Sequence, residues 1–241
     1  MKKTLFVFLC FLAVFSCKKP LDVEKPDTKV TEHFAADDII KWTYEHQDTS
    51  TINPCWLEDD VVCIKTRAKT YDRAKLHTEQ LYQDGTYTWR TFIPEVGKGD
   101  MTSIGSWIYC DDHHEVDFEV GYGTEEIRQK AHCFDYELVA CMTNQDYPYK
   151  SGYVPIAPGW HEFSIKLDLY DASGQGAMFY EIHWLIDGVE RQSLKTEYGV
   201  SAATFRIYVS VENLKFIGSH IASQDNVGKF DWITFEGNKK K

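Results

Sequence analysis

Three carboxylates stand at alternate positions in one short run of the sequence, at Glu115, Asp117 and Glu119. The residues between them, Val116 and Phe118, are bulky and apolar, which predicts a β-strand with one acidic face. Three like charges side by side repel, so an ordinary sheet gains nothing from this arrangement. Hydrolysis of a sugar acetal does use it. That reaction needs one carboxylate as nucleophile and a second carboxyl, with a raised pKa, as general acid and then base.

The spacing of Glu115 and Glu119 suits a reaction that retains the configuration of the anomeric carbon. Four strand rises separate their Cα atoms by roughly 13 Å, and each side chain can lean inward. This brings the carboxyls toward the separation of roughly 5 to 5.5 Å that such enzymes use. Asp117 would lie between them and share a proton with the nucleophile. The alternative for the same pattern is an acidic, solvated face of an antiparallel sheet.

The rest of the chain predicts short strands that hold this run. Alternating or aromatic-rich segments recur between turn signals, and no segment has the pattern of a long amphipathic helix. Asp187-Gly188 is the strongest hairpin signal, a two-residue turn between two such segments. The spacing predicts an all-β sandwich or barrel in one large domain. The expected strands cover residues 39–44, 61–65, 86–93, 103–109, 115–122, 127–134, 136–142, 161–167, 179–186, 189–194, 205–211 and 229–235.

Composition narrows the classes of partner. The 241 residues are 43% hydrophobic and 15% aromatic, enough for a sizeable core and for flat rings on which sugars can stack. The formal net charge is −11 and becomes more negative without Lys2 and Lys3, so we expect no nucleic-acid partner. A neutral partner fits better.

The N-terminus has the pattern of an export signal. Lys2 and Lys3 precede an apolar run that is too short to span a membrane, which predicts a signal peptide over residues 1–16. The run ends in Ser16-Cys17, which resembles a bacterial lipobox and predicts lipidation of Cys17. Residues 17–32 are rich in charge and proline and are expected to form a tether, with the functional domain at 33–241. We therefore expect a lipoprotein of the bacterial cell envelope, anchored in the outer membrane.

Leaving out Cys10 and Cys17, five cysteines remain, so at least one is unpaired. Cys55 with Cys63, and Cys133 with Cys141, are close enough in sequence for hairpin-scale disulfides, although sequence does not fix the connectivity. No C-x-x-C motif occurs, so neither a zinc knuckle nor a thioredoxin-type site is supported.

Several motifs in a fixed order resemble family 16 glycoside hydrolases. Besides the E-x-D-x-E run, the resemblance rests on segments that match the family's successive strands between about residues 75 and 236. These segments are Tyr87 to Phe92, Gly105-Ser106-Trp107-Ile108-Tyr109, Gly159-Trp160-His161-Glu162-Phe163-Ser164-Ile165, Tyr180 to Arg191 and Phe230-Asp231-Trp232-Ile233.

The resemblance implies a concanavalin A-like jelly-roll β-sandwich with a substrate cleft across its concave sheet. It makes Glu115 the nucleophile, Asp117 the residue that tunes it and Glu119 the general acid/base. The run has the regular spacing found in mixed-linkage β-glucanases. The implied protein is an exported, retaining endo-β-glycan hydrolase, a monomer that acts on a polysaccharide or oligosaccharide and requires no cofactor. The alternatives are a non-catalytic glycan-binding surface lipoprotein of the same fold and a purely structural surface domain.

The sequence departs from the family pattern in the cleft. His113-His114 replaces the usual Trp-Asp before the first glutamate, and Glu212 stands where a later concave strand usually has tryptophan. Thr91 replaces the glutamate of the aromatic-Gly-Arg-aromatic-Glu run. Because the tryptophans stack on sugar rings, their replacement indicates a different substrate or weaker binding.

The resemblance to the family also indicates which residues would bind substrate. His113 could hydrogen-bond a sugar hydroxyl, and His132 falls near a sugar-binding position on the expected strand 127–134. On that strand Arg128, Lys130 and His132 would share a face, which could equally be a plain exposed one. Trp89 is either a stacking platform or a core residue, and Ser210 with Glu212 is assigned to the later concave strand. Trp107, Trp184 and Trp232 are assigned to structure.

Metal sites receive little support from the sequence. The run Cys110-Asp111-Asp112-His113-His114 contains ligand types, but adjacent residues on a turn diverge, so we assign no metal there. Asp231 could help hold a structural calcium ion of the kind that some family members carry.

Overall fold

The computed structural model describes residues 28–34, 41–48 and 50–239. The predicted signal segment, Cys17 and most of the predicted tether lie outside these residues. Within the described part of the chain, no helix is long and apolar enough to cross a membrane.

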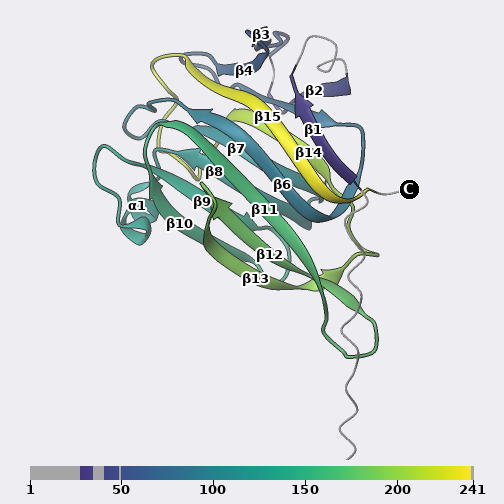
Figure 1. The fold of residues 1–241 in the computed structure, drawn as a ribbon. Coiled ribbons are helices and arrows are strands. Elements are labelled where there is room, and N and C mark those ends of the chain that lie inside the picture. The colour runs from purple at the N-terminus through teal and green to yellow at the C-terminus, as the bar shows by residue number, and fades with distance from the viewer. Residues whose placement is uncertain (1–27, 35–40, 49, 240–241) are drawn as a thin grey trace, which may run out of the picture.

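Two antiparallel sheets stack face to face, which confirms the predicted all-β sandwich (Figure 1). The first sheet, called the outer sheet, also includes a strand that pairs with β15 at one side of its path. Its members, in spatial order, are β13 (Val189–Gly199), β12 (Met178–Ile186), β11 (Gly159–Asp171), β6 (Tyr82–Ile93), β15 (Asn226–Lys239), β4 (Val61–Thr66) and β3 (Cys55–Glu58), with β1 (Thr28–His33) paired to β15.

The second sheet, called the cleft sheet, carries the acidic run on a central strand. The strand β8 (His114–Gly121) lies between β7 (Thr102–Asp111) and β9 (Leu138–Asn144). The full order is β10 (Lys150–Ile156), β9, β8, β7, β14 (Arg206–Asn213), β5 (Arg73–Thr78) and β2 (Trp42–His46).

The core between the sheets follows from side-chain alternation. Val116, Phe118 and Val120 on β8 point into it and are almost fully buried, so the three acidic residues must point to the opposite face. Two buried tryptophans of the outer sheet bind the backbone of the cleft sheet. Trp184 Nε1 donates to the carbonyl oxygen of Asp117 at 3.1 Å, and Trp89 Nε1 donates to that of Tyr208 at 3.1 Å. The first of these bonds ties the acidic strand to the core.

The predicted Asp187-Gly188 hairpin is confirmed. Both residues have positive φ, +51° and +75°, and Ile186 pairs with Val189, as a two-residue turn of type I′ requires. The Asp187 side chain also accepts a hydrogen bond from the backbone N–H of Glu162 at 2.9 Å. The turn is therefore held to the neighbouring strand β11.

The expected strand at 127–134 is wrong, because the segment forms the helix α1 (Glu125–Ala131). Thr124 caps the helix by accepting from the N–H of Ile127, and Glu126 pairs with Lys130 one turn later at 2.7 Å. The apolar side of α1 packs on the open face of the cleft sheet. The small cluster that results contains Ile127, Ala131, Val139, Cys141 and Ile217.

Most of the remaining predicted strands are present, but the prediction missed β1, β3, β5 and β10. The first predicted strand, at 39–44, begins outside the described residues and overlaps β2, which covers Trp42–His46. The strand β1 begins at Thr28, inside the segment assigned to the tether, and pairs with β15 from Thr28 opposite Gly237 to His33 opposite Trp232. The sandwich thus includes residues that the sequence assigned to the tether.

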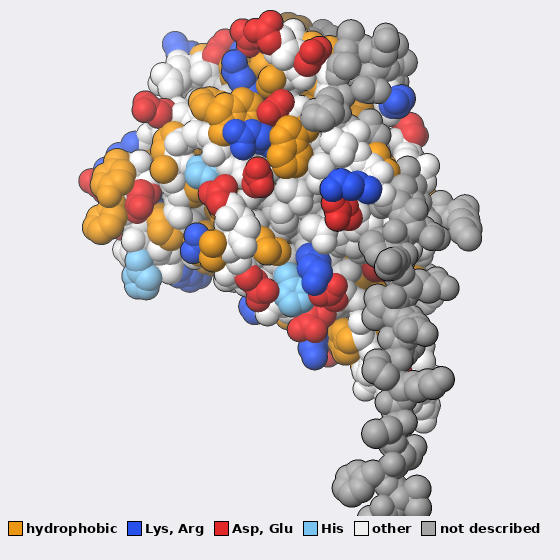
Figure 2. Space-filling model, viewed as in Figure 1, with side chains coloured by type: hydrophobic (Ala, Val, Ile, Leu, Met, Phe, Trp, Pro, Cys, Tyr) orange, Lys and Arg blue, Asp and Glu red, His pale blue; other side chains and the backbone are white. Residues whose placement is uncertain are grey.

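Figure 2 shows the charged side chains of the described residues on one face of the molecule. Acidic and basic side chains are interspersed on the face seen in Figure 2.

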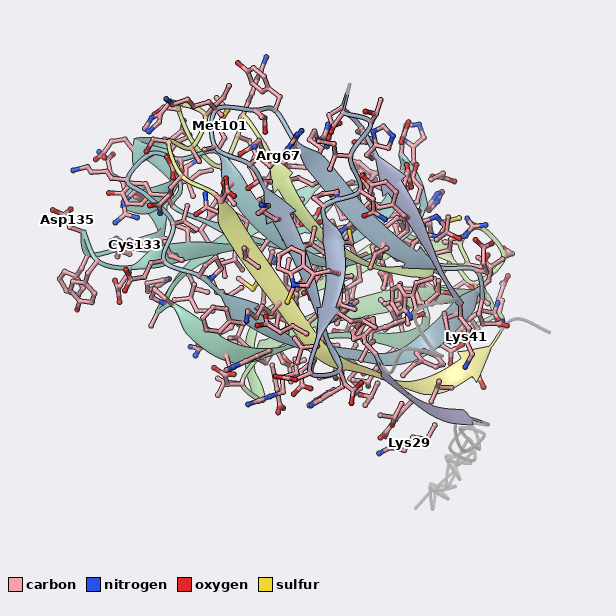
Figure 3. All side chains as sticks on the ribbon, turned by 90° about the horizontal axis from the view of Figure 1, so that it is seen from above. Lys29, Lys41, Arg67, Met101, Cys133 and Asp135 are labelled. Atoms are coloured by element: carbon pink, nitrogen blue, oxygen red, sulfur yellow. The ribbon has the colours of Figure 1, made fainter. Side chains whose placement is uncertain are left out.

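Asp135, in the loop after α1, lies at the opposite end of the molecule from Lys41 (Figure 3). The loop is held by Arg128, which is buried and donates to the carbonyl oxygens of Tyr122, Phe134 and Glu137.

Candidate active site

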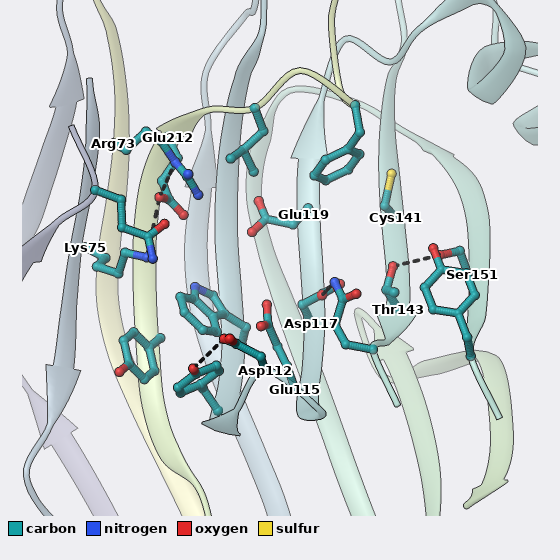
Figure 4. Close-up of a pocket in the computed structure, with 18 of the residues that line it drawn as sticks. Arg73, Lys75, Asp112, Glu115, Asp117, Glu119, Cys141, Thr143, Ser151 and Glu212 are labelled. Carbon is teal, nitrogen blue, oxygen red and sulfur yellow. Dashed lines mark hydrogen bonds and ion pairs between the residues drawn. The ribbon is translucent and has the colours of Figure 1, made fainter. Parts of the chain in front are cut away.

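The open face of the cleft sheet bounds a cavity of about 530 Å³ (Figure 4). Glu115, Asp117 and Glu119 of β8 all line it, as the alternation of the sequence predicts. The three side chains follow one another along β8 and point into the cavity (Figure 4). One wall is formed by β14, β5 and β2, and the other by β9 and β10.

Glu115 is the first of the three carboxylates along β8 and is half-buried. The pKa of Glu115 is raised to about 7, with burial as the largest cause. The positive charge of Lys75 opposes this rise, and the nearby carboxylates of Glu212 and Asp112 contribute to it. A carboxyl with this pKa is ionised in an appreciable fraction of molecules at neutral pH.

Asp117 is buried in the middle of the row, with 2% of its surface exposed. Burial raises the pKa of Asp117 well above its usual value, and the charge of Glu115 adds to the effect. Gln145 Nε2 donates to Asp117 Oδ2 at 3.2 Å, and among the described residues no group forms a well-aligned hydrogen bond with the buried Oδ1. A protonated Asp117 removes the cost of an uncompensated charge and supplies a proton beside Glu115.

Glu119 lies at the inner end of the row and is 7% exposed. Burial raises the pKa of Glu119 well above its usual value, and the next largest cause is the negative charge of Glu212. Ser103 Oγ donates to Glu119 Oε2 and opposes the rise. The raised pKa favours the protonated form of Glu119, and the Ser103 hydroxyl fixes the orientation of its carboxyl group.

Gly105 makes room for this carboxyl. It pairs with Glu119 on one side and with Ser210 on the other. A Cβ atom at position 105 would lie 2.2 Å from Ser210 Oγ and 3.0 Å from Glu119 Oε1. A larger residue there would displace the buried acid.

The wall formed by β5 and β14 is charged. Glu212 is 3% exposed, and its Oε1 lies 3.0 Å from Arg73 Nε and 3.5 Å from Lys75 Nζ. The Lys75 amine lies 5.2 Å from the ring centre of Trp107, which also stacks on Tyr208 with ring centres 4.0 Å apart. Because Lys75 and Tyr208 pack against its ring, Trp107 is only 5% exposed.

The opposite wall is neutral and hydroxyl-rich. Tyr149 is 64% exposed and its hydroxyl lies 2.8 Å from Ser151 Oγ, which is 3.0 Å from Thr143 Oγ1. Tyr153 follows on the same face of β10. This wall offers both a ring face and hydroxyl groups to a sugar.

The structure brings some of the predicted substrate-binding residues to the cleft and not others. Glu212 lines it, and Ser210 lies beneath Trp107, whose Nε1 donates to Ser210 Oγ at 3.1 Å. The stacking role of Trp89 is wrong, because this residue is fully buried between the sheets. His132 is also misassigned. It is the exposed C-cap of α1 with φ of +56°, because the expected strand is a helix.

His113 is exposed in the turn between β7 and β8 and does not line the cavity. Its neighbour His114 turns away, with Nδ1 2.8 Å from Asp111 Oδ1 and its ring packed against Tyr198. Within the described residues, no group of three or more His, Cys, Asp or Glu side chains could hold a metal ion. Asp231 instead lies 3.5 Å from Arg90 Nε.

Sequence reasoning missed Arg73, Lys75, Tyr149 and the cleft position of Trp107. The alternation Arg73-Ala74-Lys75-Leu76 was the available signal, since it places two cations on one face and two apolar residues on the other. Trp107 was assigned to structure, whereas the same side chain lines the cavity.

The five described cysteines are all free thiols in this structure. Cys55 pairs with Ile64 and Cys63 with Trp56, so these two cysteines are not opposite each other in their hairpin. Cys141 is buried at the cavity wall opposite Glu119, and burial raises the pKa of its thiol well above the usual value.

This chain resembles known proteins in its fold and not closely in its sequence. No protein-family model matches the sequence, and no curated protein matches it. Solved structures do match. The catalytic domain of an endo-1,3-β-glucanase (laminarinase) from Thermotoga petrophila superposes with a TM-score of 0.61 at 14% identity, covering 88% of this chain and 97% of that one. The β-glucanase of Bacillus licheniformis gives 0.60 at 11% identity, covering 87% and 98%.

The Crh5 transglycosylase in complex with NAG gives a TM-score of 0.60 at 14% identity, covering 88% of this chain and 85% of that one. The chain has the fold of these enzymes. The sandwich therefore has the jelly-roll fold of these β-glucanase and transglycosylase structures. At these identities the likeness concerns the fold, and it does not separate laminarinases, mixed-linkage glucanases and transglycosylases.

Proposed function

We propose that this protein is a retaining endo-β-glycan hydrolase that cleaves O-glycosidic bonds of a polysaccharide. The observation that carries the proposal is the row Glu115, Asp117 and Glu119 on the central strand of the cleft sheet, where all three carboxyls face one cavity and two are buried. The likeness in fold to β-glucanases supports it.

In the first step, Glu115 attacks the anomeric carbon while Glu119 donates its proton to the glycosidic oxygen. The bond from the anomeric carbon to that oxygen breaks, and a glycosyl ester with Glu115 forms. In the second step, Glu119 removes a proton from water, the water oxygen bonds to the anomeric carbon, and the ester bond breaks. The starting protonation states are those that the cleft favours, with Glu119 neutral and Glu115 near its titration midpoint at pH 7.

Asp117 supports the nucleophile in this scheme. Its buried carboxyl accepts a hydrogen bond from Gln145, and burial together with the charge of Glu115 raises its pKa and favours a proton on Asp117. When the glycosyl ester forms, Glu115 loses its charge, and the cost of two neighbouring carboxylates no longer holds the proton on Asp117. The pair therefore adjusts its proton content during the cycle.

The test is release of reducing sugar from mixed-linkage glucan, xyloglucan, laminarin, agar and chitosan. We expect the purified protein to hydrolyse at least one of them and the Glu115→Gln variant to hydrolyse none. Glu58→Gln, at an exposed position on β3 of the outer sheet and away from this cavity, is the matched control and should retain activity. If the wild-type protein releases nothing but an affinity gel containing the polysaccharide retards it, the protein is a glycan-binding lipoprotein instead.

A further inference from the structure

A second hollow adjoins the cleft at the edge of the cleft sheet. It has a volume of about 670 Å³ and lies where the chain leaves β2 and where it enters β5. We call this cavity the edge hollow. Its lining includes Asp48, Ser50 and Ile52 on the β2 side and Arg67, Tyr71 and Asp72 on the β5 side.

The edge hollow and the cleft share part of their lining. Gln47 and Arg73 line both cavities, and Arg73 stands at the side of the cleft away from Thr143 and Ser151 (Figure 4). Strand order explains this position, because β5 and β2 follow β14 at the edge of the cleft sheet. A chain of sugars that crosses the strands of the cleft sheet in the direction of β5 therefore meets the edge hollow as it leaves the sheet.

The fixed charges of the edge hollow are paired within the protein. Arg67 donates from Nε and Nη2 to the two carboxylate oxygens of Asp72, both at 2.7 Å. Asp48 accepts from the backbone N–H groups of Ser50 and Arg73, at 2.6 and 2.5 Å. The two arginines and two aspartates of the lining also balance in formal charge. A lining of this kind favours a neutral ligand over an ionic one.

Arg73 keeps hydrogen-bond donors for such a ligand. Among the described residues, its guanidinium donates one hydrogen bond, from Nε to Glu212 Oε1 at 3.0 Å. The two Nη groups donate none within that part of the chain, and 34% of the side chain is exposed. Because the guanidinium is planar, its bond to Glu212 restricts the directions in which the Nη groups point. These groups can donate to sugar hydroxyl oxygens at the junction of the two cavities.

Tyr71 supplies an exposed ring beside these donors. It is 58% exposed, and its hydroxyl forms no hydrogen bond with any described residue. Ile52, which is 52% exposed, adds apolar surface to the same lining. An aromatic ring left in water in this way offers a face on which the apolar side of a sugar can stack, while nearby polar groups bind its hydroxyls.

We propose that the edge hollow is a further glycan subsite, in which a neutral sugar unit of the chain held in the cleft stacks on Tyr71 and accepts hydrogen bonds from Arg73. The inference deepens the proposed hydrolase function and rests on it for the identity of the ligand. It implies that a long chain binds more tightly than a short one, because only a long chain occupies both cavities.

The experiment measures glycan binding in the Glu115→Gln background, which prevents hydrolysis during the measurement. Affinity gels that contain mixed-linkage glucan, xyloglucan or laminarin compare this parent protein with its Tyr71→Ala and Tyr71→Phe derivatives. We expect Tyr71→Ala to raise the dissociation constant for the bound glycan by about 3- to 10-fold. Tyr71→Phe keeps the ring and should bind as the parent does.

Tyr136→Ala is the matched control, because Tyr136 is 77% exposed in the loop after α1 and lines neither cavity. It should leave the retardation unchanged. Unchanged retardation in Tyr71→Ala would overturn the proposal, and so would no retardation of the parent in any of these gels. Equal losses in Tyr71→Phe and Tyr71→Ala would contradict stacking on the ring. Loss of retardation at high salt concentration would contradict a neutral ligand.

The length of a competing oligosaccharide separates the edge hollow from the cleft. With gluco-oligosaccharides as competitors, the difference between the parent and Tyr71→Ala should vanish for chains too short to occupy both cavities. An equal loss of affinity for short and long chains would overturn the assignment to the edge hollow.

Failure of this subsite is distinct from failure of the hydrolase proposal. If Tyr71→Ala weakens binding as expected and the wild-type protein hydrolyses no glycan, the subsite stands and the hydrolase function is wrong. If the wild-type protein hydrolyses a glycan that Tyr71→Ala binds as tightly as its parent, the hydrolase function stands and the subsite is wrong.

Discussion

At the scale of single residues, Glu115, Asp117 and Glu119 share one strand face but have different surroundings. Glu115 is partly exposed and lies within reach of the charge of Lys75, whereas Asp117 and Glu119 are buried. Burial raises the pKa of all three carboxyls, so their neighbours decide which one is ionised. The sequence predicted the three carboxylates and their shared face. It could not predict their pKa values, because Lys75 and Glu212 come from strands distant in the chain.

The pKa of Glu115 sets the acid limb of activity. A nucleophile must be ionised, so we expect kcat/KM to fall as the pH drops through about 7, where Glu115 takes up a proton. Glu119 has a raised pKa and keeps the proton it must donate over the same range. The check is kcat/KM for a hydrolysed glycan as a function of pH. An acid limb near the ordinary glutamate pKa of about 4.3 would contradict the role of burial.

Glu119 should also reduce stability at alkaline pH. Its folded-state pKa is raised above the unfolded value, so its favourable contribution is complete below the unfolded pKa and is lost as the pH rises. Glutamine carries no charge, so we expect Glu119→Gln to be more stable than the wild type at pH 8, by on the order of 1 to 3 kcal/mol.

Urea unfolding at pH 8 and at pH 4 measures this difference, which should vanish at the lower pH. Glu126→Gln is the control, because Glu126 is exposed and its hydrogen bond with Lys130 lowers its pKa. That variant should gain no stability at pH 8. Equal stabilities of Glu119→Gln and wild type at pH 8 would show that Glu119 is not held protonated by its surroundings.

At the scale of elements, a strand could be predicted from the sequence where polar and apolar residues alternate clearly. The strand β8 alternates carboxylates with bulky apolar residues and was predicted nearly to its ends. The strand β10 contains Gly152 and Pro155 and was missed, because proline fits a strand only at a sheet edge such as this one. The helix α1 was read as a strand because alternating cations outweighed the capping signal of Thr124.

Because the strand β5 was not predicted, two charged residues of the candidate site were missed. The strand β5 supplies Arg73 and Lys75 to the cleft, and its mixed charged and apolar pattern was not assigned to any element. Conversely, His132 and Trp89 were placed in the cleft through an incorrect strand and an incorrect face. The local sequence pattern was therefore enough to identify the carboxylates. The residues of the charged wall could not be predicted in this way, because they are brought to the cleft by the pairing of strands that are far apart in sequence.

The strand β7 lies between Glu119, the proposed general acid, and the charged wall formed by β14 and β5. Gly105→Ala brings a methyl group against Ser210 Oγ and Glu119 Oε1, so we expect kcat/KM to fall by about 10-fold or more and stability to drop by about 1 to 3 kcal/mol. Ser210→Ala in the same protein removes the nearer contact and should recover part of both losses. The measurements are kcat/KM and urea unfolding. A Gly105→Ala protein with wild-type activity would contradict this role of β7.

At the scale of the whole molecule, the acidic row and the first described strand lie on different sheets. The strand β1 begins at Thr28 and pairs with β15 of the outer sheet, whereas the catalytic row lies on the cleft sheet (Figure 1). We propose that Cys17 carries a lipid anchor. The anchor would then precede β1, the strand that pairs with the C-terminal strand β15.

The anchor is tested by Cys17→Ala in the full-length protein. We expect this variant to lose incorporation of labelled palmitate and to move from the membrane fraction to the soluble fraction, because acyl chains supply the attachment. Cys10→Ala, within the predicted signal segment, is the control and should fractionate as the wild type does. Retention of Cys17→Ala in the membrane fraction with undiminished labelling would exclude a lipid on this cysteine.

The central claim is a double displacement in which Glu115 forms a covalent bond to the sugar. The most direct measurement is ¹H NMR of the anomeric configuration of the first product released from a hydrolysed glycan. We predict the β anomer first, followed by slow mutarotation, and no product from Glu115→Gln. Initial release of the α anomer, or undiminished release by Glu115→Gln, would contradict the account.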